Sequence, residues 1–245
     1  MKLPKPILLA VLLTLQYSLS AQVQWYQNQD GNNQLPTGTV PTSIQSFTPA
    51  SFVACYLWRT ENDTYTWKIS KTHINGTEQR CFFVSGTTCM VEMRAGGFNS
   101  VYILNRNFPI GQNPEYLLYK LDSNLNIIMQ KTISFPGNFN IFNLGCFELD
   151  KFGNVYLAGD GQYSDGQNFG FASFVMKTNS MLNTQWSRMD SVQTSYTRLH
   201  IDRWGRVIVL EDFFTFFPEL RISRISHNGQ YVQRLSMTTD PGRYS

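Results

Sequence analysis

Short apolar stretches alternate with polar turns along most of this chain, and their spacing is that of β-strands. A clear example is the pair Cys146–Leu149 and Val155–Ala158, two apolar segments that flank the polar turn Asp150–Asn154. No stretch keeps the helical period over the length that an amphipathic helix requires. The pattern therefore predicts an all-β protein that is built from many short strands.

The polar turn belongs to a unit that recurs along the chain. The segment Asp150–Gly159 returns as Asp202–Glu211 and, more loosely, as Arg94–Leu104, at intervals of about 50 residues. Such a period is expected of a propeller blade, which has four strands, and it is far longer than one hairpin. The repeat thus indicates an architecture and no chemistry.

The later strands of each unit carry a signature of their own. The third strand ends at a basic residue before a polar turn, at Lys71, Lys120, Lys177 and Arg224. The fourth strands are expected at residues 79–84, 127–133, 184–189 and 231–237. We therefore predict a β-propeller of about four four-stranded repeats. The repeats are expected at residues 43–88, 89–140, 141–194 and 195–240, after an N-terminal strand and lead-in at residues 22–42.

Closure of the ring is an open question at this point. The segment Val23–Tyr26 resembles the fourth strand Thr184–Ser187, as if it were meant to complete another blade. Either four blades close, or the chain is an incomplete part of a larger propeller, whose exposed strand edges would favour self-association or a partner chain. An open β-solenoid or a β-sandwich is the alternative architecture, but the period fits both less well.

The third repeat also resembles a known family. Asp150–Gly159 followed by Phe174–Asn179 is similar to the repeat of bacterial secreted β-propeller proteins, which have D-x-x-G-N-V-Y-x-x-G turns. The resemblance extends over residues 43–240, although the second repeat has Arg94 where the pattern has aspartate. It implies a propeller fold, and it implies no particular activity because such repeats occur in proteins that share no chemistry.

Residues 1–21 have the pattern of a secretory signal peptide. Lys2 and Lys5 precede the apolar run Ile7–Leu15, and the small-residue stretch Ser18–Ala21 follows. No later segment approaches the roughly 20 apolar residues of a membrane-spanning helix. We therefore expect an exported protein, extracellular or periplasmic, without a transmembrane segment.

Charge and composition narrow the choice of partner. The formal net charge is +3 at pH 7, and the basic residues are spread through the repeats. Nucleic-acid binders are expected to show a strong basic patch, so we expect no nucleic-acid partner. Protein and carbohydrate ligands stay open.

One polar position recurs on the first strands of three repeats. Alignment of the repeats places Glu92, Glu148 and His200 at this position, each between apolar neighbours. If the three side chains converge, they could bind a divalent metal or act as acid and base on an extracellular glycan, as in a hydrolase or lyase. The alternative is that they form local hydrogen bonds with backbone groups or water.

Two loops are further candidates. The loop of residues 160–168 contains Asp160 and Asp165 and could hold calcium, although its spacing is not that of an EF-hand. We otherwise expect no cofactor. The matching loop of the fourth repeat is rich in aromatic residues that could stack on a sugar, seat a protein or pack against a neighbouring blade. These residues are Phe213, Phe214, Phe216 and Phe217.

The cysteines indicate no catalytic or metal centre. The chain has four, Cys55, Cys81, Cys89 and Cys146, in no metal-knuckle spacing, and buried thiols are favoured over any particular disulfide pairing. The sequence thus favours an exported, non-enzymatic binding or interaction module that presents loops on a β-propeller. The alternatives are the glycan-active enzyme described above and a truncated propeller that needs a partner chain.

Overall fold

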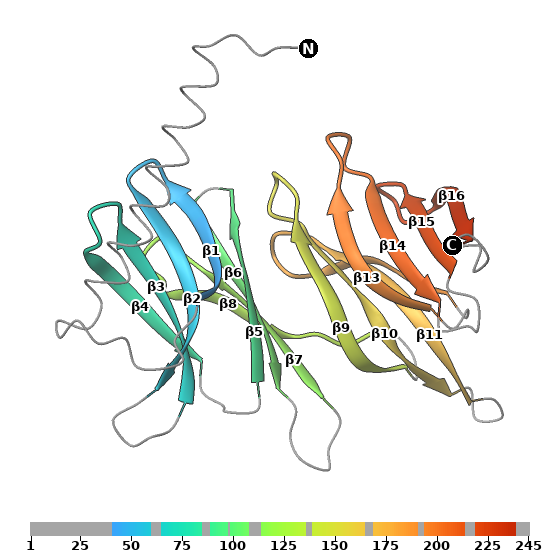
Figure 1. Ribbon diagram of the computed structural model, residues 1–245, viewed down its shortest axis with the longest axis horizontal. Helices are drawn as coiled ribbons and strands as arrows, with labels where there is room; N and C mark the ends of the chain where they lie inside the picture. Colours follow the sequence, from blue (N-terminus) through green and yellow to red (C-terminus); the bar gives the residue numbers. More distant parts are fainter. Residues whose placement is uncertain are drawn as a thin grey trace, which may run out of the picture. The chain divides into compact units, whose positions relative to one another are not determined.

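The computed structural model describes residues 41–59, 65–84, 89–97, 99–107, 114–135, 139–164, 169–190, 194–213 and 219–238. Every regular element in these segments is a β-strand (Figure 1). The expected leader and the segment Val23–Tyr26 lie outside the described residues.

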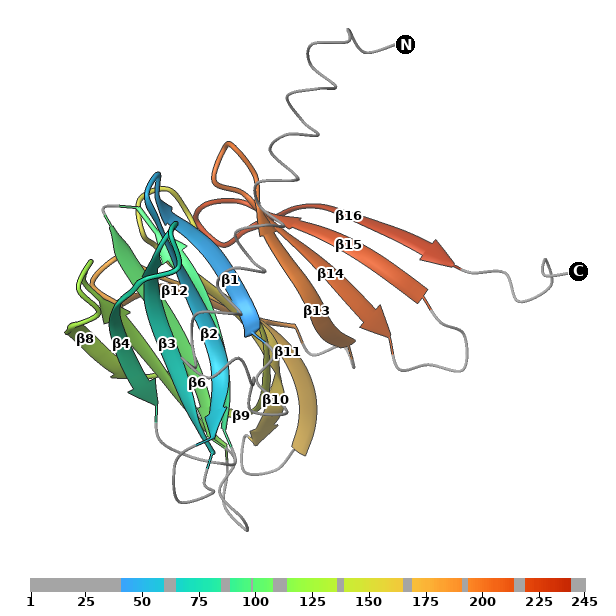
Figure 2. The same cartoon turned by 60° about the vertical axis from the view of Figure 1, so that its left-hand side comes forward.

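The strands form four antiparallel sheets, and in each sheet four consecutive strands neighbour one another in chain order. The first sheet contains β1 (Pro41–Thr48), β2 (Ser51–Arg59), β3 (Tyr65–His73) and β4 (Glu78–Val84). The second contains β5 (Cys89–Gly96), β6 (Ser100–Asn107), β7 (Glu115–Leu121) and β8 (Ile127–Thr132). The third contains β9 (Phe139–Leu149), β10 (Val155–Ser164), β11 (Phe169–Thr178) and β12 (Thr184–Asp190). The fourth contains β13 (Thr194–Ile201), β14 (Val207–Phe213), β15 (Glu219–Ile225) and β16 (Tyr231–Thr238) (Figure 2).

Four-stranded sheets of this up-and-down kind are propeller blades, so the predicted all-β propeller fold is confirmed. The described residues fall into two compact units. One holds the first sheet together with the turn Asp122–Asn126, and the other holds the second, third and fourth sheets. No helix long and apolar enough to cross a membrane occurs in the described segments.

The first sheet buries the middle of its two central strands. Val53 and Ala54 on β2 and Ile69 on β3 have no exposed surface. Lys68 on β3 is also buried, and its ammonium lies 2.7 Å from the Glu78 carboxylate on β4. The ion pair compensates for part of the cost of burying the lysine charge.

The third sheet is buried on both faces. Val155 and Leu157 of β10 pack in a large apolar cluster with the second sheet, whereas Tyr156 and Ala158 pack in a smaller one with the fourth. Successive side chains of a strand point to opposite faces, so an apolar run without alternation is what such a position requires. The absence of polar alternation in this strand follows from its place between two neighbours.

Two of the recurrent basic residues of the third strands lie over aromatic rings of their own sheets. Lys120 at the end of β7 lies 5.5 Å from the centroid of the Tyr102 ring and donates a 2.9 Å hydrogen bond to the carbonyl of Ser180 in the third sheet. Lys177, at the equivalent place on β11, lies 5.3 Å from the Tyr156 ring. Lys120 therefore links the second sheet to the third, whereas the ring contact of Lys177 lies within the third sheet.

The cysteines are only partly as expected. Cys146 is a buried free thiol, and burial raises its pKa to about 11, with a smaller contribution from Glu92. Cys55 is buried, whereas Cys81 carries a free thiol on the exposed outer strand β4. The expectation of buried thiols is wrong for Cys81 because outer strands have one face in solvent. The side chain of Cys89 lies outside the described residues.

Candidate functional site

Two equivalent turns of adjacent sheets form the candidate site. The first is the β9–β10 turn, in which the Gly153 amide donates a 3.0 Å bond to the Asp150 carbonyl. Oδ1 of Asp150 accepts bonds of 2.9 Å from the amides of Phe152 and Asn154, and Oδ2 accepts one of 2.7 Å from the Asn154 side chain. Gly153 has a φ of 77°, which a residue with a side chain rarely adopts. Aspartate and glycine thus hold the turn in one shape.

The β13–β14 turn repeats this arrangement. Oδ1 of Asp202 accepts bonds of 2.9 and 3.0 Å from the amides of Trp204 and Arg206, and Oδ2 lies 2.7 Å from Nε of Arg206. Burial by itself would raise the pKa of Asp202, but the hydrogen bonds from Arg206 and Trp204 outweigh it, so the pKa is lowered. The Asp202 carboxylate therefore stays ionised, and its oxygens are hydrogen-bonded within its own turn.

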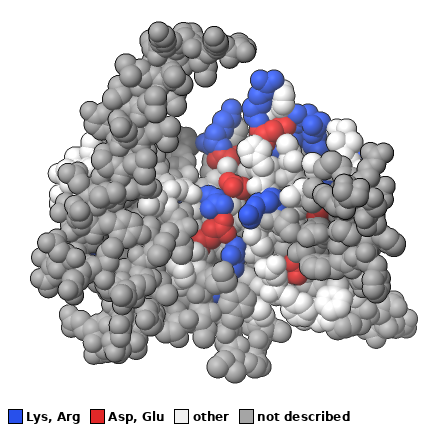
Figure 3. All heavy atoms as spheres, in the orientation of Figure 1, with Lys and Arg blue, Asp and Glu red and all other residues white. Residues whose placement is uncertain are grey.

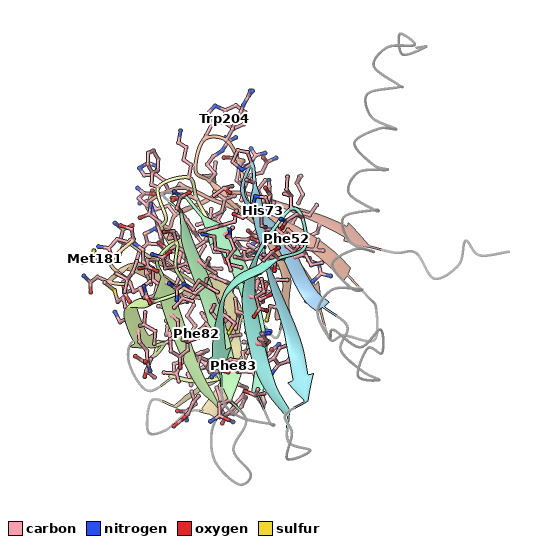
Figure 4. The ribbon with its side chains drawn as sticks, turned by 90° about the vertical axis from the view of Figure 1, so that its left-hand side faces the viewer. Phe52, His73, Phe82, Phe83, Met181 and Trp204 are labelled. Atoms are coloured by element: carbon pink, nitrogen blue, oxygen red, sulfur yellow. The ribbon has the colours of Figure 1, made fainter. Side chains whose placement is uncertain are left out.

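Each turn directs one aromatic side chain into solvent. Phe152 is 63% exposed and Trp204 is 60% exposed, and they stand at the same position of their turns. Trp204 lies at the tip of its turn, clear of the strands (Figure 4). Large exposed rings at equivalent places of adjacent repeats need an explanation beyond packing, since neither contributes to a core.

Basic side chains lie against both rings. Lys151 places its ammonium 5.0 Å from the centroid of the Phe152 ring. The guanidinium carbons of Arg203 and Arg206 lie 4.0 and 4.4 Å from the Trp204 ring. Cations at these distances are attracted by the ring quadrupole, so rings and charges form one surface.

A groove of about 340 Å³ runs between the two turns. We call it the two-turn groove, and its lining residues are Leu149, Asp150, Lys151, Phe152, Ile201, Asp202, Arg203, Trp204 and Gly205. Its volume falls at the lower end of the range of small-ligand sites, which is about 300–1,000 Å³. On the face shown in Figure 3, basic and acidic side chains of the described residues lie interspersed.

A second cluster contains two of the three residues predicted from the repeat alignment. Arg94 on β5 lies 2.6 Å from Glu92 and 3.4 Å from Glu148, so it joins the two carboxylates. Arg106 on β6 adds a 2.6 Å ion pair to Glu92. The structure thus brings Glu92 and Glu148 together through arginines, and an acid–base role would have to break these pairs.

His200 on β13 is exposed and lies opposite Ile208 of β14, the place that Glu148 holds opposite Tyr156 of β10. In the second sheet this place belongs to Arg94, and Glu92 lies two residues earlier, opposite Leu104, so the predicted alignment of Glu92 with the other two is off by two positions. Within the part of the chain that is described, no three His, Cys, Asp or Glu side chains gather as metal ligands. Catalysis or metal binding by Glu92, Glu148 and His200 stays a prediction.

The loop candidates are mostly beyond the described residues. Asp160 accepts a 3.2 Å bond from the Asn143 side chain, whereas Asp165 is not described. The aromatic loop of the fourth repeat is not described either, namely Phe214, Phe216, Phe217 and the side chain of Phe213. Calcium binding and ring stacking at these loops also stay predictions.

Sequence reasoning missed the two-turn groove although its residues were within the repeat. The signal was the aromatic residue directly before the glycine, Phe152 in one unit and Trp204 in the next. It also missed the role of Arg94, which lies on β5 opposite Tyr102 and pairs with both carboxylates of the second cluster.

Comparisons with known proteins do not assign the chain to a family. No protein-family model matches it, and no curated protein is similar to it. Among solved structures, a protein of unknown function from Bacteroides caccae is 11% identical, with 83% of this chain and 84% of that one covered and a TM-score of 0.36. A subtype N11 neuraminidase-like protein of a flat-faced bat strain from Peru is 9% identical, with 84% and 94% covered and a TM-score of 0.26. Likenesses of this size carry no argument about function.

Proposed function

We propose that this protein is an exported binding module and that the two-turn groove is its ligand-binding surface. The observation that supports this is the pair of exposed rings, Phe152 and Trp204, which stand at equivalent positions of adjacent turns and line one groove. Export rests on the signal-peptide pattern of residues 1–21.

The turns are suited to binding because their shape is fixed before a ligand arrives. Asp150 and Asp202 each accept two backbone amides of their own turn, and Gly153 and Gly205 supply the left-handed residue. A side chain displayed on a preorganised turn loses little conformational entropy on binding. Exposed aromatic rings then provide contact area, and adjacent cations provide orientation.

The test is a binding assay on the chain from residue 22 to 245. Immobilised neutral and acidic polysaccharides are the probes, and retention of the wild-type protein is compared with that of Phe152→Ala and Trp204→Ala. Each substitution is expected to weaken binding about tenfold or more, the effect of removing one aromatic anchor.

Met181→Ala is the matched control. Met181 is 57% exposed in the turn between β11 and β12 of the same unit and does not line the groove (Figure 4). Retention should be unchanged in this variant. Binding that survives both aromatic substitutions, or no binding to any probe, would count against the groove as the ligand surface.

A further inference from the structure

We infer that the ligand of the two-turn groove is a sugar that carries a carboxylate, such as a residue of a uronic-acid polysaccharide. This inference rests on the proposed function of the groove. The charges and hydrogen-bond donors of the groove favour this one class of ligand.

The two acidic residues of the groove are directed into their own turns. Asp150 accepts four hydrogen bonds, from two amides, the Asn154 side chain and the Tyr156 hydroxyl. Asp202 accepts two amides and is paired with Arg206 at 2.7 Å. Their oxygens therefore have few acceptor sites left for ligand hydroxyls.

The cations of the groove remain able to bind an anion. Arg203 makes no ion pair with any described residue, and its guanidinium carbon lies 4.0 Å from the centroid of the Trp204 ring. A guanidinium carries its N–H donors in a planar fork that meets a carboxylate in a bidentate pair. Lys151 provides a second positive charge on the opposite turn.

The rings suit the apolar face of a sugar. Phe152 and Trp204 remain more than half exposed although cations lie close to them, so part of each ring is open to a ligand. An exposed ring beside a fixed cation can contact the C–H groups of a sugar ring while its carboxylate pairs with the cation. One groove therefore offers both contacts that a uronic acid needs.

An extended acidic peptide fits less well. A peptide that docks as an extended strand is held by main-chain hydrogen bonds to a sheet edge or to exposed amides. In the groove the amides of Phe152, Asn154, Trp204 and Arg206 already donate to Asp150 and Asp202. Few main-chain donors are left for a peptide, whereas a sugar does not require them.

The test compares each sugar with its own neutral form. Oligomers of galacturonate, mannuronate and hyaluronate are titrated by calorimetry, once with free carboxyl groups and once as methyl esters, against the chain from residue 22 to 245. We expect at least one free acid to bind about tenfold more tightly than its ester and to weaken as salt is raised. Arg203→Gln should remove that preference. Arg80→Gln, on the exposed outer strand of the first sheet, should keep it.

The outcomes separate this inference from the proposed function. Equal binding of acids and esters that is lost in Trp204→Ala would overturn the carboxylate assignment and leave the groove as the binding surface. Binding of a polyglutamate peptide as tightly as the best sugar would also overturn it. Absence of binding by all three free acids would overturn it, whatever neutral polysaccharide is retained.

Discussion

The third sheet packs against its two neighbours in different ways. Toward the second sheet the contact is the large apolar cluster, in which the hydroxyl groups of Tyr102 and Tyr116 donate to backbone carbonyls. Toward the fourth sheet the apolar cluster is smaller, and a row of polar side chains continues it. These side chains are Asp190, Tyr196, Glu211, Tyr231 and Arg234.

The polar row connects β12 of the third sheet to the fourth sheet. The hydroxyls of Tyr196 and Tyr231 lie 3.0 Å apart, and Tyr231 donates a 3.1 Å bond to Asp190, which also pairs with Arg234. A fully satisfied network of hydrogen bonds specifies one arrangement more sharply than apolar contacts do. We therefore expect the apolar contact chiefly to stabilise the fold, and the polar contact to fix the position of the third sheet against the fourth, which we call the sheet register.

The largest loss of stability is expected from substitutions in the apolar contact between the second and third sheets. Leu157 is fully buried in the large cluster and Leu199 is 7% exposed in the smaller one. Leu157→Ala should lower the free energy of unfolding by about 3–5 kcal/mol and Leu199→Ala by about 2–3 kcal/mol, because a deeper site leaves a larger cavity. Urea unfolding of both variants measures the difference. A larger loss in Leu199→Ala would mean that the small cluster carries more of the stability.

Substitutions in the polar contact should lower the stability less, and they should also change the affinity of the groove for its ligand. Tyr231→Phe removes a hydroxyl that contacts both Tyr196 and Asp190, and should cost about 1–2 kcal/mol. Tyr116→Phe removes one bond to the carbonyl of Phe142, which does not line the groove, and should cost about 1 kcal/mol. The discriminating measurement is the affinity of the groove. We expect it to weaken in Tyr231→Phe, where sheet register is disturbed, and equal affinity in both variants would refute the register role.

The sequence predicted the sheets more fully than the contacts between them. Strands and turns follow from local signals, such as the aspartate and glycine of Asp150–Gly153, and the described strands lie where such signals occur. The polar row joins Asp190 to Tyr231 across two sheets, and nothing local marks such a pair. Exposure of Phe152 and Trp204 in one groove likewise depends on how neighbouring repeats pack.

A pH titration tests the polar contact at Glu211, a residue of β14 that has no exposed surface. Burial raises its pKa, and Ser223, Arg234 and Arg221 offset this only in part. The folded protein therefore holds this proton more tightly than the unfolded chain, so stability falls as pH rises above the ordinary glutamate pKa. Glu211→Gln should flatten the decline of the urea midpoint between pH 4 and pH 8. The corresponding change in stability should be smaller than the losses expected for the leucine and tyrosine variants. Glu115→Gln, at an exposed site on β7, should leave it unchanged, and an unaltered slope in Glu211→Gln would exclude this origin.

The smallest effect is expected at the ion pairs on the first strands of the second and third sheets, whose charged residues belong to neither apolar cluster. Glu148 lies 3.4 Å from Arg94 and is about one third exposed, so solvent screens the pair. Glu148→Gln should change the free energy of unfolding by about 0.5 kcal/mol or less, and 1 M salt should abolish the difference because it screens exposed charges. Glu92 contacts both Arg94 and Arg106 at 2.6 Å, so Glu92→Gln should cost more than Glu148→Gln. If both variants cost as much as Tyr231→Phe, the charged cluster would belong with the polar contact as a determinant of sheet register.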